Sequence, residues 1–255
     1  MTTLTTTTER PVEEIDQLLA NLKLKRMREL AARELARAAQ EGSGADEVLV
    51  RLLREQWRYQ QERSLLSRLE DARIPQKWDL ETFPWERQPG LQRAQVKLLA
   101  SLDFVSTGSN VVLLGETGVG KTGVATGLLL AALRSGHSGR FIKAQDLFDE
   151  MFASLADRST RRLLDSLARL KVLLIDELGY LTIKPEQANT FFRLMDMRYT
   201  GNRTTIITSN LHYDDWAQML GHEKMTAALL GRLRQRCTTL HIQGPSLRVP
   251  SHGPM

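Results

Sequence analysis

The apolar positions in the first part of the chain recur at the spacing of a helix. One set falls at i, i+3, i+4 and i+7, which places its members on one face of an amphipathic helix. Its members are Ile15, Leu18, Leu19 and Leu22. A stretch with two glycines at 41–46 interrupts this pattern, and a second long helical pattern begins at Glu47. These patterns predict a small all-helical domain.

Beyond residue 90 the apolar pattern changes, and short runs of strand length alternate with stretches of helix length. The runs are NVVLLG at 110–115, RFIKA at 140–144, VLLIDE at 172–177, TTIITSN at 204–210 and TTLHIQ at 238–243. Strands separated by helical segments predict a parallel sheet with helices on both faces, which is the α/β class. Ligands of such sheets bind beyond the carboxyl ends of the strands.

The change of pattern coincides with a stretch at 74–90 that contains three of the eight prolines and two of the four tryptophans. The expected parts of the chain are a tail at 1–10, a helical domain at 11–75, a linker at 76–90, an α/β domain at 91–250 and a tail at 251–255. The first ten residues lack the cationic and apolar segments of a signal peptide.

The segment GETGVGKT at 115–122 matches the phosphate-loop pattern G-x-x-x-x-G-K-[ST] between a predicted strand and a predicted helix. A glycine-rich turn with a chance lysine is the alternative, and the flanking elements favour the nucleotide site. Backbone N–H groups of the loop would face the phosphates, as would the Lys121 side chain, and the Thr122 hydroxyl would bind Mg²⁺. The loop residues are Gly115, Glu116, Thr117, Gly118, Val119 and Gly120.

Two adjacent acids, Asp176 and Glu177, end the apolar run in LLIDELGYL at 173–181. A solvated turn after a strand is one interpretation. The other is a hydrolytic site, in which Asp176 holds Mg²⁺ and Glu177 polarises the attacking water. The ion and the phosphate-loop lysine would supply the positive charge that makes the acid pair tolerable. The two motifs together predict an ATPase that uses ATP and Mg²⁺.

Three further polar residues are candidates for the same site. Asn210 ends a predicted strand, where its amide would hydrogen-bond the attacking water or the γ-phosphate, although asparagine also favours loops. Arg232 lies in the helical segment ALLGRLRQR, whose arginines either form a solvated face or reach a neighbouring subunit's γ-phosphate. Arg248 is a candidate contact to the protein's own nucleotide, and residues 83–92 are expected to hold the adenine.

Composition adds little to this picture. Thirty-five basic and thirty acidic residues give a net charge of +5 and a pI near 9.5, which suits a polyanionic partner without requiring one. Cys237 is the only cysteine, so a reducing compartment is natural. The longest apolar stretch, at 124–133, is too short to span a bilayer. We therefore expect a cytoplasmic protein without a membrane partner.

Basic residues of the helical domain are candidates for contact with double-stranded DNA. One group is Lys23, Lys25 and Arg26, and the other is Arg51, Arg54 and Arg58. The second group has helical spacing, so its members share one face. Such a face would bind phosphates without sequence preference and with strong salt dependence. Acidic residues lie among them, so a solvated helix pair is an equal alternative.

The order of the motifs GETGVGKT, LLIDELGYL, TTIITSNL, ALLGRL and SLR resembles that of the IstB-like transposition helper ATPases, AAA+ proteins related to the DnaC helicase loader. The resemblance implies a P-loop AAA+ core, with Walker A at 115–122 and Walker B at Asp176 and Glu177. It also implies that Asn210 is the first sensor, Arg232 an arginine finger between subunits and Arg248 a second sensor.

The same resemblance implies an ATPase that oligomerises on DNA as a ring or spiral and assists an insertion-sequence transposase in target selection. Hydrolysis would then occur at subunit interfaces. One alternative keeps the fold and makes the protein a DnaC-like loader of a replicative helicase. A small-molecule kinase is disfavoured by Glu177, because a kinase must keep water out of the transfer. A structural DNA-coating protein without turnover is the fourth possibility.

Overall fold

The computed structural model describes residues 11–76, 78–179 and 181–248. The expected tails at 1–10 and 251–255 lie outside the described residues. The chain divides into two compact units, Met1–Leu66 and Ser67–Met255, and the division falls inside a long helix. Among the described helices, none combines the length and the apolar character that crossing a membrane requires.

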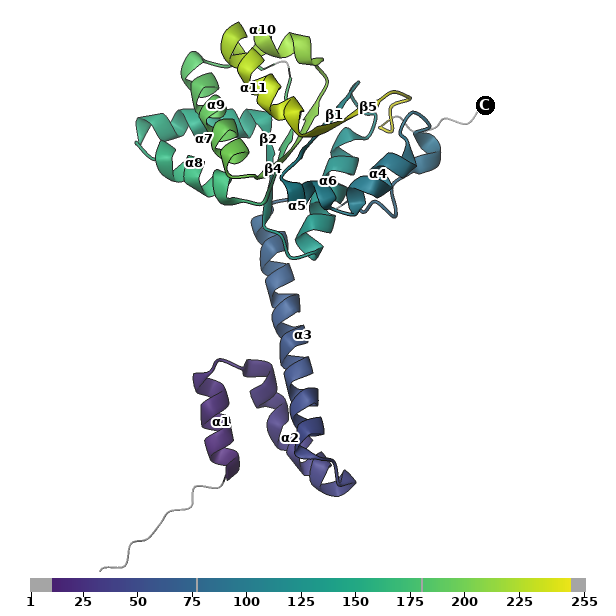
Figure 1. Cartoon of the computed structure of the whole chain (residues 1–255), viewed down its shortest axis with the longest axis vertical. Coiled ribbons are helices and arrows are strands. Elements are labelled where there is room, and N and C mark those ends of the chain that lie inside the picture. The colour runs from purple at the N-terminus through teal and green to yellow at the C-terminus, as the bar shows by residue number, and fades with distance from the viewer. Residues whose placement is uncertain (1–10, 77, 180, 249–255) are drawn as a thin grey trace, which may run out of the picture. The chain divides into compact units, whose positions relative to one another are not determined.

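The first unit is helical, as predicted, and contains α1 (Pro11–Asn21), α2 (Lys25–Glu41) and most of α3 (Ala45–Asp71) (Figure 1). Its core is small and consists of Leu19, Met27, Leu30, Ala31, Ala38, Val48 and Leu52. The buried Gln56 side chain of α3 accepts a hydrogen bond of 3.0 Å from the Met27 backbone N–H. That N–H belongs to the first turn of α2 and has no partner within its own helix.

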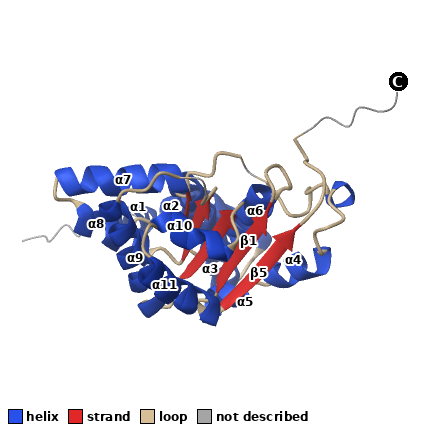
Figure 2. Ribbon diagram, turned by 90° about the horizontal axis from the view of Figure 1, so that it is seen from above, coloured by secondary structure: helices blue, strands red, loops and turns tan. Residues whose placement is uncertain are grey.

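The second unit contains a five-stranded sheet in the order β2-β3-β4-β1-β5. All strand pairs are parallel. The strands are β1 (Asn110–Gly115), β2 (Gly139–Lys143), β3 (Val172–Asp176), β4 (Thr204–Ser209) and β5 (Cys237–Ile242). The predicted α/β class is therefore confirmed, because each predicted apolar run forms a strand and the runs are joined through helices (Figure 2).

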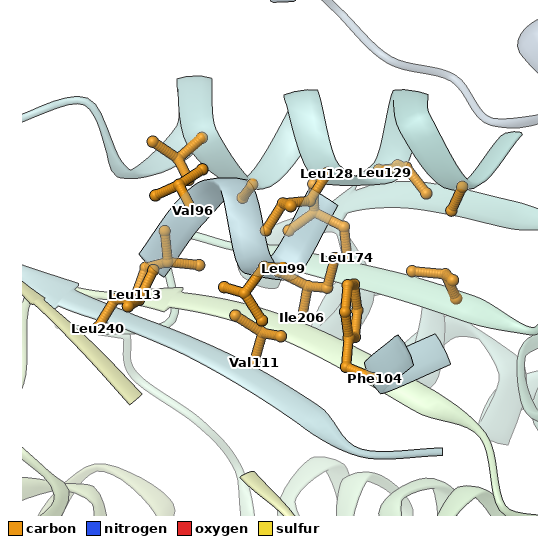
Figure 3. Packing of buried hydrophobic residues seen from close by; sticks show 14 of the residues in the cluster. Val96, Leu99, Phe104, Val111, Leu113, Leu128, Leu129, Leu174, Ile206 and Leu240 are labelled. Atoms are coloured by element: carbon orange, nitrogen blue, oxygen red, sulfur yellow. The ribbon is translucent and has the colours of Figure 1, made fainter. Parts of the chain in front are cut away.

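Helices cover both faces of the sheet. They are α4 (Arg93–Ala100), α5 (Asp103–Thr107), α6 (Lys121–Arg134), α7 (Ala144–Ala156), α8 (Thr160–Arg169), α9 (Pro185–Thr200), α10 (Trp216–Leu220) and α11 (Glu223–Gln235), with 3₁₀ turns at Trp85–Arg87 and Tyr213–Asp215. Successive strand residues point to opposite faces. Val111 and Leu113 pack under α4 and α6 (Figure 3), whereas Val112 and Leu114 pack under α7, α9 and α11. Burial on both faces explains why the strands read as unbroken apolar runs.

The segment at 76–90, which we expected to be a linker, packs on the second unit. Phe83 is 3% exposed and belongs to the core that contains α6. The buried Gln88 side chain donates to the Val119 backbone oxygen of the phosphate loop (2.8 Å) and to the Pro245 oxygen (3.3 Å). This segment therefore forms one wall of the region beyond the strand ends.

Arg198 is a buried cation that joins three elements of the second unit. Its guanidinium donates to the backbone oxygens of Leu167, Leu170 and Thr204 and to the Thr205 hydroxyl. The side chain is 1% exposed, and burial lowers its pKa to about 9. Two of the acceptors lie at the carboxyl end of α8, where a helix favours a positive charge.

Candidate nucleotide site

The phosphate loop connects β1 to α6, and two of its glycines are required by geometry. Gly118 (φ +89°) and Gly120 (φ +96°) lie in the left-handed region that favours glycine. A Cβ on Gly118 would lie 2.2 Å from the Ser246 Oγ, and one on Gly120 would lie 2.9 Å from the Phe83 ring. The loop is thus closed in by Phe83 on one side and by Ser246 and Leu247 on the other.

Lys121 and Thr122 begin α6, where the helix dipole favours an anion. The Lys121 Nζ donates to the Gly115 oxygen (2.7 Å) and the Glu116 oxygen (2.8 Å), so the side chain curls over the loop. Burial lowers the pKa of Lys121, against the attraction of nearby carboxylates. The Thr122 hydroxyl points to the end of β3 and donates to the two carboxylate oxygens of Asp176 (2.9 and 3.1 Å).

Asp176 and Glu177 follow one another but lie in different environments. Asp176 ends β3, is 2% exposed and accepts a 2.6 Å hydrogen bond from the Thr208 hydroxyl of β4. Burial raises the pKa of this carboxyl. Glu177 has a φ of +60°, an uncommon conformation for a residue with a side chain, and its carboxylate is about half exposed. The left-handed turn therefore sends one acid into the protein and the other into the cavity.

Two basic side chains lie beside the Glu177 carboxylate. Lys143 Nζ is 3.5 Å away, and an Arg248 guanidinium nitrogen is 3.9 Å away. Lys143 ends β2 and pairs in register with Asp176 on β3. Our sequence reasoning did not single out Lys143, although its place at the end of RFIKA was an available signal. Exposed ion pairs of this kind are weak, so Glu177 is held loosely.

One cavity of about 360 Å³ is lined by the phosphate loop and Glu177, and the buried Asp176 is joined to it through Thr122. The phosphate loop, Glu177, Asn210 and Arg248 form its polar wall. Its apolar wall is formed by Trp78, Phe83 and Leu247, with Gln76 beside them. Of the residues expected to hold adenine, Phe83 lines the cavity. Trp78 and Leu247 were not expected there, because Trp78 precedes the expected segment and Leu247 was not assigned a contact with the nucleotide.

Arg232 lies elsewhere. It is on α11, pairs with Asp196 of α9, and has its guanidinium 5.8 Å from the centre of the Tyr199 ring. It lines a different cavity from the one that contains Lys121 and Glu177. Within one chain, the fold therefore brings together the Walker residues, Asn210 and Arg248, and leaves Arg232 apart from them.

Several of the basic residues of the first unit form ion pairs with nearby acids. The ion pairs are Arg26–Glu29 (3.3 Å), Arg51–Glu34 (3.5 Å), Arg51–Glu41 (3.7 Å) and Arg58–Glu55 (3.1 Å). Lys23, Lys25 and Arg54 are exposed and form no ion pair with any described residue. The positive charge that faces solvent is therefore smaller than the sequence suggested.

The residues of the cavity fit a nucleoside triphosphate with Mg²⁺. The Thr122 hydroxyl and the Asp176 carboxylate are adjacent oxygen donors, the type that Mg²⁺ prefers. The glycines of the loop expose backbone N–H groups at the start of α6, which is the arrangement that binds phosphate.

Comparison with known proteins agrees with this site. The family described as "IstB-like ATP binding protein" matches residues 17–252. The chain belongs to this family. Members of the family that resemble it include the ATP-binding protein named for insertion sequence IS21 in Pseudomonas aeruginosa, which is 36% identical over 93% of this chain and 89% of the relative. The protein named for IS232 in Bacillus thuringiensis is 34% identical over 81% and 82%.

Solved structures with the same fold include DnaI, at 24% identity and a TM-score of 0.56, covering 68% of this chain and 91% of DnaI. The DnaC helicase loader matches at 21% identity and a TM-score of 0.52, covering 59% and 88%. At these identities the likeness concerns the fold alone. It confirms the predicted fold of the second unit, a parallel sheet with helices on both faces, and family membership makes this an ATP-binding protein associated with insertion sequences.

Proposed function

We propose that this IstB-like protein hydrolyses ATP at the interfaces of an oligomer on double-stranded DNA, and thereby assists an insertion-sequence transposase. The observation that carries the proposal is that Lys121, Thr122 and Glu177 line one cavity and that Thr122 donates to the buried Asp176 carboxylate, although these residues come from different parts of the chain. A cytoplasmic location is part of the proposal, because ATP and DNA are both present there.

Each residue has a role that follows from its position. The loop N–H groups and Lys121 bind the phosphates, and Thr122 with Asp176 would hold Mg²⁺, which supplies positive charge to the β- and γ-phosphates. Glu177 is the carboxylate that faces the cavity, so it is placed to orient a water and accept its proton. Asn210 lines the same cavity and offers a neutral amide to that water.

The position of Arg232 supports hydrolysis between subunits. An arginine that stabilises the transition state must contact the γ-phosphate. Arg232 lines another cavity of its own chain, but its side chain is 53% exposed on α11. We therefore assign it to the nucleotide of a neighbouring copy.

A mixing experiment tests this assignment. Arg232→Ala and Glu177→Gln are each expected to abolish turnover while nucleotide binding persists. In an equimolar mixture, about a quarter of random interfaces combine an intact Glu177 with an intact Arg232 from the next copy, so about a quarter of the wild-type rate should return. Arg234→Ala, on the same helix, is the control and should remain active. No recovery at any mixing ratio would exclude the trans arrangement.

DNA and transposase are proposed partners on other grounds. The relatives are named for insertion sequences, which favours a transposase over the replicative helicase that a DnaC-like loader would bind. A pull-down with the transposase of the same element and with a DnaB-type helicase separates the two.

The DNA contact is tested by measuring how much duplex DNA stimulates the ATPase. Replacing Lys23, Lys25 and Arg54 with glutamate should reduce that stimulation. Phosphate released without a phosphorylated metabolite would distinguish hydrolysis from kinase activity, and no turnover even with DNA would support a purely structural role.

A further inference from the structure

A second cavity of the second unit is a groove between α9 and α11, lined by residues other than those of the nucleotide cavity. α9 and α11 lie side by side (Figures 1 and 2), and the space between them is about 730 Å³. The Tyr199 hydroxyl near the end of α9 donates to Gln235 at the end of α11 (2.6 Å), so the two helices run in the same direction. We call this cavity the α9–α11 groove.

The groove has an apolar floor and a cationic rim. Phe192, Met195 and Leu229 line it and are each less than 9% exposed. Apart from the buried Arg198, four arginines line it, Arg193, Arg203, Arg232 and Arg236, against a single acid, Asp196, which pairs with Arg232. Arg193 and Arg203 form no ion pair with any residue in the described part of the chain. Such a groove favours an occupant with an apolar stripe and negative charge.

The chain itself contains a segment of this kind in α1. Its sequence up to residue 22 has three acids and no basic residue. Leu18 and Leu22 are 51% and 66% exposed, and they follow Glu14 at intervals of four, so the three side chains form one row. Among the described side chains of this helix, the adjacent Leu19 is the one that packs in the small core. Glu14 has no partner among the described residues, whereas Asp16 pairs with Arg28.

The length of the groove also agrees with the length of the row from Glu14 to Leu22. The α9 residues that line the groove extend from Asn189 to Thr200, which is about 16 Å at the rise of a helix. The row from Glu14 to Leu22 covers about 12 Å. The row therefore fits within the groove, with its leucines on the floor and its acid at the rim.

We propose that α1 of one copy of this protein docks in the α9–α11 groove of a second copy, with Leu18 and Leu22 on its apolar floor and Glu14 facing Arg193 and Arg203. The choice of a second copy rests on the proposed function, because Arg232 lines the groove and is assigned there to a subunit boundary. The docking would link neighbouring copies independently of nucleotide. Double-stranded DNA is a weaker occupant, because an apolar floor offers nothing to a phosphate backbone.

Crosslinking between differently labelled copies tests the proposal. One full-length variant carries Leu18→Cys and another Met225→Cys, both in a Cys237→Ser background; Met225 lines the groove and is 40% exposed. The two are mixed without nucleotide and treated with a short bis-maleimide. A crosslinked product that contains one chain of each variant is expected. Two pairings serve as controls and should give little of it: Leu18→Cys with Leu98→Cys on α4, where residue 98 is 71% exposed, and Glu13→Cys with Met225→Cys.

Further substitutions in the cysteine variants distinguish specific docking from chance collision. Adding Leu22→Ala to the first protein should lower the crosslinking rate about tenfold, because that leucine would be buried. Glu14→Arg should lower it up to about fivefold, and Arg193→Glu on the other protein should restore it. These positions are exposed, so the changes leave the fold intact.

Three outcomes would overturn the proposal. The first is absence of the mixed product, and the second is a product of monomer mass only, formed when one chain carries both cysteines. The third is an Arg193→Glu variant that loses duplex DNA affinity while crosslinking is unchanged. Since the readout is a mass formed without ATP, it can fail while Arg232 and Glu177 variants complement each other, and it can succeed when they do not.

Discussion

Replacing Asp176 with asparagine separates the cost of burying its charge from the benefit of holding Mg²⁺. Asp176 is 2% exposed, and burial raises its pKa above the ordinary value of 3.8. The folded protein therefore binds this proton more tightly than the unfolded chain does. The stability that comes from the protonated carboxyl is lost as the pH rises through the raised pKa, so at neutral pH the ionised group is a cost.

Without ligand at neutral pH, we expect Asp176→Asn to be at least as stable as the wild type. The gain is limited to about 1 kcal/mol, because the substitution also removes a carboxylate that attracts Lys121. In a unit of this size, 1 kcal/mol corresponds to about 2–4 °C in melting temperature. The difference between the two proteins should shrink toward acidic pH, where the wild-type carboxyl takes up its proton.

With nucleotide and Mg²⁺ bound, the wild type should be more stable than Asp176→Asn. A nucleotide at a hundred times its Kd stabilises the folded state by about 2.7 kcal/mol, which is about 5–11 °C for the wild type. In Asp176→Asn the part of this shift that depends on Mg²⁺ should vanish, so melting curves with Mg²⁺ and with EDTA should coincide. Differential scanning calorimetry of both proteins measures all of these values.

Glu177→Gln is the matched control, because Glu177 is exposed and does not contact Thr122. It should leave the melting temperature without ligand unchanged and keep the Mg²⁺-dependent shift. Two results would contradict these expectations: Asp176→Asn melts more than about 4 °C below the wild type without ligand, or it retains the full Mg²⁺-dependent shift.

Three further substitutions have defined outcomes. Lys143→Ala frees the Glu177 carboxylate from an exposed ion pair, and steady-state ATPase assays should show a basal rate up to about fivefold higher. Gly120→Ala places a Cβ 2.9 Å from the Phe83 ring at a φ of +96°, so denaturant unfolding should show a loss of about 1–3 kcal/mol and calorimetry a weaker affinity for ATP. Arg198→Met leaves three buried carbonyls without their donor, and urea unfolding should show a loss of about 3–5 kcal/mol.

Each of these three substitutions has a control variant or a result that would contradict it. Lys143→Arg keeps the charge and should leave the rate unchanged, and a lower rate in Lys143→Ala would mean that the lysine assists hydrolysis. Gly231→Ala, where a Cβ meets nothing within 4 Å, should stabilise α11 by up to about 1 kcal/mol. A loss below about 1 kcal/mol in Arg198→Met would show that relief of the buried charge offsets its hydrogen bonds.

The α/β class and the position of the site were predictable because both depend on local patterns of apolar residues and glycines in the sequence. Runs such as NVVLLG and VLLIDE are long enough in apolar residues to require burial on both faces, and a parallel sheet is the arrangement that provides it. The glycines of GETGVGKT predicted a tight turn, and the structure shows Gly118 and Gly120 in the conformation that only glycine adopts easily.

The walls of the cavity were harder to predict. The pattern assigned no nucleotide contact to Trp78 or Leu247, and they meet at the nucleotide cavity because the segments around residues 78 and 247 both pack against the phosphate loop. The position of Lys143 beside Glu177 was not predicted for a similar reason. Its contact with Glu177 depends on the register of β2 beside β3, which no periodicity within either strand encodes.

By itself, the sequence determined which elements form and which residue types stand at their ends, because helix and strand periods, turn glycines and strand-end acids are local properties of the chain. Only the tertiary structure decided which of those ends meet. The strand order β3-β4-β1 brings Asp176 beside Thr122, and the packing of α11 on α9 keeps Arg232 away from them. Contacts between residues distant in sequence depend on how the elements pack, and a one-dimensional pattern does not carry that information.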